Sequence, residues 1–381
     1  MHYPRKLDLA RDLEKRSVLL FGPRRTGKSA LIRHALSPDR TYDLLQADTF
    51  QALSARPSLI REALRPQDRL VAIDEIQKLP VLMDEVHGLI ESTSTHFLLT
   101  GSSARKLRRS GTSLMGGRAR TRRLFPFVAE EVGLETFDLD RALSTGLLPP
   151  IWLSDEPWDD LADYVGTYLQ EEIRAEGLAR NIEAFSRFVR RAALSHGELL
   201  NFESVGRDAQ VPARTVREYY DVLTDTYLGH LIEPLRTPAR KAVSHGRFYF
   251  FDNGVVNRLV GRRSLMPGTP EYGTAFEAYI AHELLAWLSY TRRDEPLNFW
   301  RTHDQVEVDF VLGGHTALEV KSSALVTERD AAHLHRLGAV TPLRRKLIVS
   351  RDPHPRRLGD VEVLPWRDFV GALWAGTLLE G

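Results

Sequence analysis

Two short stretches near the N-terminus carry residues that can bind and hydrolyse a nucleoside triphosphate. The first, GPRRTGKS at 22–29, fits the pattern G-x-x-x-x-G-K-[ST], between an apolar strand expected at 17–21 and a helix expected at 28–36. Backbone amides of such a loop cradle phosphates at the positive end of a helix. We expect Lys28 to reach the β- and γ-phosphates and Ser29 to ligate Mg²⁺. The residues expected around ATP are Gly22, Pro23, Arg24, Arg25, Thr26, Gly27, Lys28, Ser29 and Ala30.

The second stretch supplies acids for the same site. The apolar strand expected at 70–73 ends in Asp74 and Glu75. Asp74 would hold the Mg²⁺ shell, and Glu75 would polarise the attacking water as a general base. A third apolar strand, expected at 97–100, can lie beside the Asp74 strand and present Thr100 or Ser102 near the γ-phosphate. Together the stretches predict an ATP-hydrolysing enzyme with Lys28 and Glu75 as catalytic residues.

A strongly basic stretch follows the third strand. No acid occurs between Ala104 and Ala129. Three interpretations compete: contact with a polynucleotide backbone, an arginine that meets the γ-phosphate of a neighbouring subunit, and a solvated basic loop. The basic residues are Arg105, Lys106, Arg108, Arg109, Arg118, Arg120, Arg122 and Arg123.

A second set of chemically useful residues lies near the C-terminus, in QVEVDFVLGGHTALEVKSS at 305–323. Alternating apolar residues predict two strands, and a turn centred on Gly314 sets Asp309 opposite Glu319. Both carboxylates and Lys321 then share one face. Two carboxylates and the Val320 carbonyl can ligate Mg²⁺ or Mn²⁺, which would activate a water for phosphodiester cleavage. The alternative is a surface hairpin with a polar Glu–Lys face.

The middle of the chain has the pattern of a helix-turn-helix. In residues 198–231, a short helix, a turn around Val211-Pro212 and a longer helix follow one another. Two basic residues of the second helix, Arg214 and Arg217, could touch DNA. Its acids Glu218, Asp221 and Asp225 disfavour that role, and the alternative is a helical packing module. The buried face is expected to be Val216, Tyr219, Tyr220 and Leu223.

Composition bounds these interpretations. The chain has 381 residues, a formal net charge of +1, 43% hydrophobic residues and no cysteine. These values exclude a largely disordered chain, wholesale wrapping of a polyanion, a disulfide framework and a cysteine-based metal site. No apolar run approaches the ~20 residues that cross a bilayer, and the charged N-terminus has no signal-peptide core. We therefore expect a cytoplasmic protein with no membrane partner. Scattered histidines show no zinc-ligand spacing.

Several segments together resemble a family of prokaryotic AAA-type P-loop ATPases that carry a winged-helix region and a C-terminal restriction-endonuclease-like domain. The segments are GPRRTGKS, LVAIDEIQKLP, LLTGSSARKL, GGRARTRRLFPF, DYVGTYLQEEI, RFYFFDNGVVNRL and DFVLGGHTALEVKSS. The resemblance implies Arg118 as arginine finger, which needs a homo-oligomer. It also implies a PD-(D/E)xK nuclease core, although Val308 stands before Asp309 where that motif has a proline. An acid on the preceding helix would complete that core, with Glu277 in the matching position and Glu283 as the fallback.

Taken together, the sequence predicts an α/β protein in four parts. These are a P-loop AAA-type ATPase core at 1–125, a helical lid at 126–195, a winged-helix-like region at 196–265 and a PD-(D/E)xK nuclease-like domain at 266–381. The expected function is Mg²⁺-dependent ATP hydrolysis coupled to a domain that binds or cleaves DNA. The alternative is a nucleotide-switched DNA- or protein-binding scaffold with an inactive nuclease-like domain. A metabolic kinase is disfavoured because no acceptor-substrate motif is visible.

Overall fold

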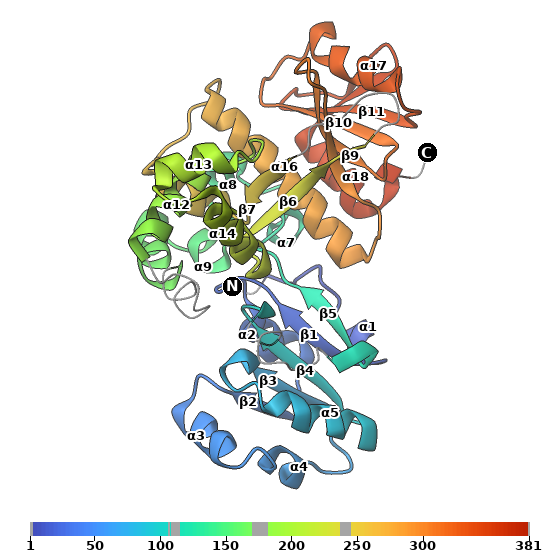
Figure 1. The fold of residues 1–381 in the computed structure, drawn as a ribbon. Helices are drawn as coiled ribbons and strands as arrows, with labels where there is room; N and C mark the ends of the chain where they lie inside the picture. Colours follow the sequence, from blue (N-terminus) through green and yellow to red (C-terminus); the bar gives the residue numbers. More distant parts are fainter. Residues whose placement is uncertain (1–2, 106, 108–114, 170–181, 237–244, 380–381) are drawn as a thin grey trace. The chain divides into compact units, whose positions relative to one another are not determined.

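The computed structural model describes residues 3–105, 107, 115–169, 182–236 and 245–379 (Figure 1). The chain divides into two compact units, which are described separately. The N-terminal unit consists of Pro4–Pro126 and Val222–Leu228, and the C-terminal unit of Met1–Tyr3, Phe127–Asp221 and Gly229–Gly381.

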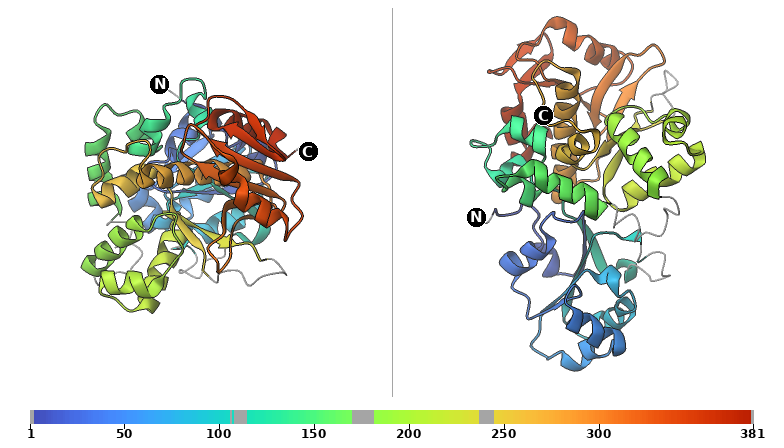
Figure 2. Two further views of the ribbon diagram at one scale, coloured as in Figure 1. Left: turned by 90° about the horizontal axis from the view of Figure 1, so that it is seen from above. Right: turned by 90° about the vertical axis from the view of Figure 1, so that its left-hand side faces the viewer.

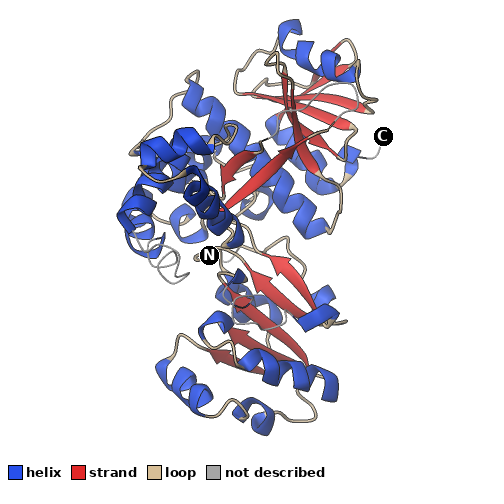
Figure 3. Cartoon of the chain, viewed as in Figure 1, coloured by secondary structure: helices blue, strands red, loops and turns tan. Residues whose placement is uncertain are grey.

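The N-terminal unit is built on a parallel five-stranded sheet (Figures 1 and 3). Its strand order is β2-β3-β4-β1-β5, so β4 lies between β1 and β3 and pairs with both. The carboxyl ends of parallel strands meet at one edge of a sheet, which is where ligands bind in open α/β folds. The strands are β1 (Ser17–Phe21), β2 (Arg40–Asp43), β3 (Leu70–Asp74), β4 (His96–Gly101) and β5 (Ala119–Arg123).

Strands β1, β3 and β4 are almost fully buried, as their continuous apolar runs predict. One core joins them to the amphipathic helix α5 through Leu82, Val86 and Leu89. The helices of this unit are α1 (Ala10–Leu13), α2 (Lys28–Leu31), α3 (Ala47–Ala55), α4 (Leu59–Ala63) and α5 (Leu82–Ser92), with a π-helix at Ile32–Leu36 and 3₁₀ turns at Ile76–Lys78 and Met115–Gly117.

The C-terminal unit begins with helices. Three of them, α12, α13 and α14, precede the β6–β7 hairpin, and they gather together in all views (Figures 1 and 2). The last turn of α14, from Val222, belongs to the N-terminal unit. The helices are α7 (Ala129–Val132), α8 (Leu139–Thr145), α9 (Pro149–Trp152), α10 (Pro157–Asp163), a π-helix at Tyr164–Leu169, α12 (Ile182–Leu194), α13 (Phe202–Ala209), α14 (Ala213–Asp225) and α15 (Asn253–Val260).

A mixed eight-stranded sheet forms the second half of this unit, in the order β12-β13-β11-β10-β9-β8-β6-β7. The hairpin after α14 therefore belongs to the same sheet as the C-terminal strands, because Glu233 of β6 pairs with Asn298 of β8. The strands are β6 (Gly229–Pro234), β7 (Arg247–Phe250), β8 (Leu297–Arg301), β9 (Glu307–Leu312), β10 (Thr316–Lys321), β11 (Arg345–Ser350), β12 (Arg356–Leu358) and β13 (Val361–Pro365).

Helices cover both faces of this sheet. One core joins Leu318 and Val320 to α16 (Pro270–Thr291) and α18 (Trp366–Ala375). A second core joins Ala317 and Val311 to α17 (Ala332–Gly338). Because successive side chains of β10 point to opposite faces of the sheet, the strand contributes residues to both cores. Short 3₁₀ turns lie at Glu328–Ala331 and Thr377–Leu379.

Two expected elements differ from the structure. The helix predicted at 28–36 is an α-helix only to Leu31 and continues as a π-helix. The basic stretch contains an unexpected strand, since Ala119–Arg123 forms β5 and pairs with β1 in parallel. Charged residues are a common feature of edge strands, because they discourage pairing with other chains. Within the described residues, no helix combines the length and apolar character needed to cross a membrane.

Candidate functional sites

The phosphate loop lies at the carboxyl end of β1. The Lys28 ammonium donates to the carbonyls of Gly22, at 2.7 Å, and Pro23, at 3.0 Å, so the loop curls around its own lysine. The Thr26 hydroxyl donates to the Pro23 carbonyl at 2.9 Å. Arg5 supports the loop from outside by donating to the Thr26 carbonyl at 2.6 Å. Phosphate oxygens can replace the two carbonyls as acceptors for Lys28.

Two glycines are required by this path. Gly27 has φ +96°, a left-handed conformation that favours glycine. At Gly22, a Cβ would lie 2.3 Å from the Leu124 carbonyl oxygen, because β5 runs directly beside the loop. Any side chain at either position would push the loop away from its phosphate-cradling shape.

Asp74 lies beside Ser29 and Thr100 at the edge where β3 and β4 end. One carboxylate oxygen accepts from the Ser29 hydroxyl at 2.5 Å, and the other accepts from the Thr100 hydroxyl. Asp74 is 4% exposed. Hydroxyl and carboxylate oxygens are the ligands that Mg²⁺ prefers, and Ser29 and Asp74 are already side by side. These residues therefore fit a Mg²⁺ ion, and the predicted convergence of the three strands is observed.

Glu75, the expected general base, has the left-handed φ of +61° just after β3. Its carboxylate accepts a hydrogen bond from Nε2 of Gln77, and the same nitrogen lies 3.2 Å from the Ser102 hydroxyl oxygen. Gln77 therefore connects the β3 end to the β4 end. Sequence reasoning missed Gln77, although a glutamine two residues after the acid pair was a visible signal.

The described arginines of the basic stretch are paired within the chain. Arg120 and Arg122 each lie 2.6 Å from the buried carboxylate of Asp12. The guanidinium of Arg123 lies over the rings of Phe125 and Tyr227, at 4.5 and 4.7 Å. Pairing with internal partners disfavours these three as polynucleotide contacts. Lys106, Arg108 and Arg109 lie outside the described residues.

Two other basic residues bear on the remaining interpretations. Arg105, four residues beyond the end of β4, lies 3.0 Å from Asp225 at the end of α14. Arg118, the expected finger, forms an ion pair with Glu91 of α5, and its side chain is 42% exposed. Arg118 is thus on the surface of the N-terminal unit, where a neighbouring subunit could meet it.

In the C-terminal unit the predicted hairpin register is observed. Thr316 pairs with Leu312 and Leu318 with Phe310, so Gly314 is the centre of the turn and Asp309 faces Glu319. Lys321 Nζ lies 2.6 Å from Glu319 Oε1. Asp309 Oδ2 accepts from the Val320 backbone amide at 2.8 Å. The three residues named for the nuclease-like site thus lie together, where β9 begins and β10 ends.

Of the two candidate acids on α16, Glu277 joins this group. Arg247 Nη1 lies 3.1 Å from Glu277 Oε1 and 3.8 Å from Asp309 Oδ1. Glu283 is occupied elsewhere, accepting from the Ala129 amide and the Trp374 indole at 2.8 Å each.

Arg247 lies among the predicted nuclease-like residues, but sequence reasoning did not identify it. It is 4% exposed, and its other nitrogen pairs with Glu307, which Arg301 also contacts at 2.7 Å. Its position on β7 gave no signal, because β7 joins this sheet only through the pairing of β6 with β8. We name the seven residues the acidic cluster: Arg247, Glu277, Arg301, Glu307, Asp309, Glu319 and Lys321.

The acidic cluster contains four carboxyl groups but only three basic side chains. Burial raises the pKa of Glu277 to about 7 and that of Glu319 to about 8, and the Asp309 carboxylate adds to both shifts. Burial pulls the pKa of Lys321 down, but Glu319 and Asp309 outweigh it and raise that pKa. A proton or a further cation is needed to offset the carboxylates.

Two observations bear on whether a metal fits this cluster. Glu319 is 3% exposed, and its Oε2 is a buried atom with no hydrogen-bond partner among the described residues. A buried carboxylate oxygen without a hydrogen-bond partner can be stabilised by binding a hard cation. In the described part of the chain, no three His, Asp or Glu side chains are arranged as a ready metal site. Asp309 and Glu319 therefore fit a divalent cation by chemistry and burial, provided that their neighbours rearrange.

On α14 the expected buried face is confirmed, since Val216, Tyr219, Tyr220 and Leu223 are all at most 6% exposed. The arginines expected on another face are exposed. Arg214 pairs with Glu218 at 3.3 Å, and Arg217 lies over the Phe202 ring at 5.0 Å. Both remain accessible to a polyanion.

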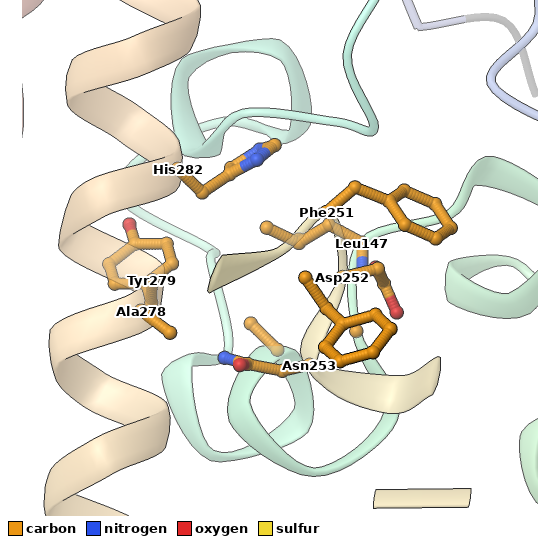
Figure 4. Close-up of a pocket in the computed structure, with 10 residues that line it drawn as sticks. Leu147, Phe251, Asp252, Asn253, Ala278, Tyr279 and His282 are labelled. Atoms are coloured by element: carbon orange, nitrogen blue, oxygen red, sulfur yellow. The ribbon is translucent and has the colours of Figure 1, made fainter. Parts of the chain in front are cut away.

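A small cavity of about 20 Å³ lies between α8, α15 and α16 (Figure 4). Tyr279 and His282 approach it from one helix, and Asp252 and Asn253 from the chain opposite. Asp252 accepts from the Leu147 and Val255 amides at 2.6 and 3.1 Å, and burial raises its pKa to about 6. The space is large enough for only about one water molecule, so we assign this cavity a structural role.

Comparison with known proteins finds three matching family profiles along the chain. Residues 14–133 match the family profile of an AAA domain. Residues 136–265 and 272–369 match two domains of unknown function, DUF8612 and DUF4143. The chain therefore carries an AAA domain near its N-terminus and a DUF4143 domain near its C-terminus, which supports an AAA-type ATPase architecture.

Two mycobacterial relatives align with most of this chain. The chain is 28% identical over 302 residues to the uncharacterized proteins Mb2031c of Mycobacterium bovis and Rv2008c of Mycobacterium tuberculosis. The alignment covers 77% of this chain and 66% of each relative. Among solved structures, Can2 from Sulfobacillus thermosulfidooxidans in complex with cyclic tetra-adenylate aligns at 12% identity over 98% of this chain and 99% of that chain. Its TM-score of 0.20 supports no argument about fold or function.

Proposed function

We propose that this protein is a Mg²⁺-dependent ATPase whose hydrolysis cycle is coupled to a DNA-binding or DNA-cleaving nuclease-like domain at its C-terminus. The observation that carries the first half is the contact of Ser29 with Asp74 at 2.5 Å, with Thr100 on the second carboxylate oxygen. This is the arrangement of oxygens that a phosphate-bound Mg²⁺ requires. Together with the AAA-domain match, it favours phosphoanhydride hydrolysis over simple nucleotide storage.

The chain's own residues would divide the work as follows. Lys28 exchanges its two carbonyl acceptors for phosphate oxygens and stabilises the charge that develops on them. Glu75 takes the proton of the attacking water, and Gln77 holds the Glu75 carboxylate toward the β4 end. Ser29 and Asp74 would hold Mg²⁺, which neutralises phosphate charge when bound. Arg118 would complete the charge stabilisation from a neighbouring subunit in a homo-oligomer.

The coupling half of the proposal rests on the order of elements. Three helices followed by the β6–β7 hairpin are consistent with a winged-helix region, and the register of β9 and β10 with a PD-(D/E)xK core. Arg214 and Arg217 offer exposed positive charge for a DNA backbone. If the nuclease-like site is live, Asp309 and Glu319 would hold Mg²⁺ or Mn²⁺, and Lys321 would orient the attacking water.

A cleavage assay tests this proposal. Single-stranded, duplex and branched DNA are incubated with Mg²⁺ or Mn²⁺, with and without ATP, for the wild type, Asp309→Ala and Glu75→Gln. Cleavage by the wild type, lost in Asp309→Ala, would establish the nuclease. Glu75→Gln should bind ATP normally and hydrolyse it at least 10²-fold more slowly. Loss of ATP binding in Glu75→Gln would contradict its role as base.

A second candidate function is a nucleotide-switched scaffold with an inactive nuclease-like domain. The specific observation in its favour is the Arg247 guanidinium, which already pairs with the carboxylates of the nuclease-like set. The scaffold predicts that no DNA is cut under either metal, while DNA or protein binding still changes with the bound nucleotide.

A further inference from the structure

We propose that Arg247 is a built-in cation that keeps the nuclease-like site closed, and that a divalent metal ion has to displace its guanidinium before binding Asp309 and Glu319. This inference rests on the proposed function, because it describes regulation of that same site. It assigns a role to a residue that no motif of the sequence singled out.

The first argument is position. The guanidinium reaches Glu277 of α16 at 3.1 Å and Asp309 of β9 at 3.8 Å, and also pairs with Glu307. These contacts bring acids from two elements around one buried cation. A buried cation is stable only when it is paired in this way, so Arg247 and the carboxylates hold one another in place.

The second argument is that this arginine is not free to bind substrate as it stands. One face of its guanidinium lies over the Phe299 ring, 5.0 Å from the ring centroid. The side chain is 5% exposed. A phosphate therefore cannot meet Arg247 until the guanidinium has left its carboxylates.

The third argument is charge. The acidic cluster holds four carboxyl groups and three cations, so it carries one negative charge in excess when all four carboxyl groups are ionised. One of these groups, Glu319, has a buried Oε2 without a hydrogen-bond partner among the described residues. The site thus attracts one more cation. A divalent ion beside Asp309 would repel the guanidinium only 3.8 Å from that carboxylate, so the two compete for it.

The test measures Mn²⁺ binding by calorimetry on the full chain without nucleotide. All proteins carry Asp74→Asn, which removes the carboxylate expected to bind a metal ion beside the phosphate loop. Arg247→Met is compared with the parent protein and with Arg301→Met. The last is a matched control, since Arg301 contacts Glu307 from a more exposed position, its side chain being 29% exposed. Adding Glu319→Gln to Arg247→Met shows whether the bound ion uses the proposed ligand.

The expected result is a gain of at least tenfold in Mn²⁺ affinity for Arg247→Met and a clearly smaller gain for Arg301→Met, which also removes one positive charge but pairs with Glu307 rather than with a proposed metal ligand. Glu319→Gln should abolish the gain. Thermal unfolding supplies a second readout, since Arg247→Met should melt lower than the parent without metal and recover with Mn²⁺. If Arg247→Met does not fold, Arg247→Lys replaces it, because an ammonium cannot bridge the same carboxylates.

Three results would overturn the inference. Equal affinity in Arg247→Met and its parent would reject displacement while leaving the metal site intact. Weaker affinity in Arg247→Met would show that Arg247 organises the site instead. Absence of Mn²⁺ binding in every variant would reject the metal site of the proposed function as well. The ATPase half of that function would be untouched, because Lys28 and Asp74 are tested separately.

Discussion

The hydroxyl oxygen of Ser29 lies 2.5 Å from a carboxylate oxygen of Asp74, although the two residues are 45 positions apart in the chain. Ser29 follows β1 and Asp74 ends β3, and the intervening strand β4 contributes Thr100 to the same carboxylate. Three strand ends are therefore tied together by oxygen atoms suited to a magnesium ion. Oxygen atoms held in place in this way make electrostatic stabilisation of a phosphate-bound metal ion effective.

Replacing Lys28 by alanine should lower kcat for ATP hydrolysis by about 10²–10³-fold, because the loop loses the cation that stabilises charge on the phosphates. Steady-state phosphate release measures this effect. Lys346→Ala, a lysine in the C-terminal unit paired with Asp360, is the matched control and should turn over like the wild type. Wild-type turnover in Lys28→Ala would remove the phosphate loop from the mechanism.

Gln77→Ala should reduce kcat by about tenfold and leave KM nearly unchanged, since a barrier increase of about 1.4 kcal/mol follows from a poorly held base. Gln77 donates to Glu75 and Ser102, so its expected role is to hold the base in place. The exposed Gln51→Ala on α3 is the control. A rise in KM with kcat unchanged would show instead that Gln77 acts in nucleotide binding.

Asp12→Ala should destabilise the N-terminal unit by roughly 3 kcal/mol, because it leaves Arg120 and Arg122 without their shared buried partner. The two arginines are partly exposed, which places the loss at the lower end of the usual range for a broken buried pair. Hydrogen exchange of β1 and β5 amides measures the loss, with the exposed Glu14→Ala as control. Unchanged exchange in β5 would mean that the arginines are satisfied by water.

The C-terminal unit should lose stability as the pH rises. The pKa of Glu319 is raised by folding from 4.5 to about 8, so its contribution is fully present below pH 4.5 and is lost as the pH rises through about 8. Each pKa unit between the two states corresponds to about 1.4 kcal/mol. The melting temperature, followed by tryptophan fluorescence between pH 5 and 9, should therefore fall less steeply in Glu319→Gln. Parallel pH profiles for the two proteins would contradict a buried, protonatable Glu319.

Part of this molecule could be predicted from sequence because local patterns determine it. Parallel strands bring their carboxyl ends together, so Ser29, Asp74 and Thr100 lie close to one another. Alternation and a glycine turn likewise predicted the pairing of Asp309 with Glu319. In both cases the partners are set by strand direction and register, which a single sequence carries.

The rest depends on tertiary packing that no local pattern encodes. Arg247 pairs with acids of α16 and β9 only because the β6–β7 hairpin joins the C-terminal sheet. Asp12 is buried because two arginines more than 100 positions away, on an unexpected edge strand, reach it. Side chains such as these look like ordinary surface charges in a sequence that is 27% charged.

The most direct test of the central claim is ATP turnover by the wild type and by Asp74→Asn during a Mg²⁺ titration, with and without single-stranded, duplex and branched DNA. The account predicts Mg²⁺-dependent turnover by the wild type that changes with at least one DNA, and a loss of about 10²-fold or more in Asp74→Asn. Equal turnover by the two proteins would contradict the assignment of the site. Wild-type turnover that none of the three DNAs changes would contradict its coupling to DNA.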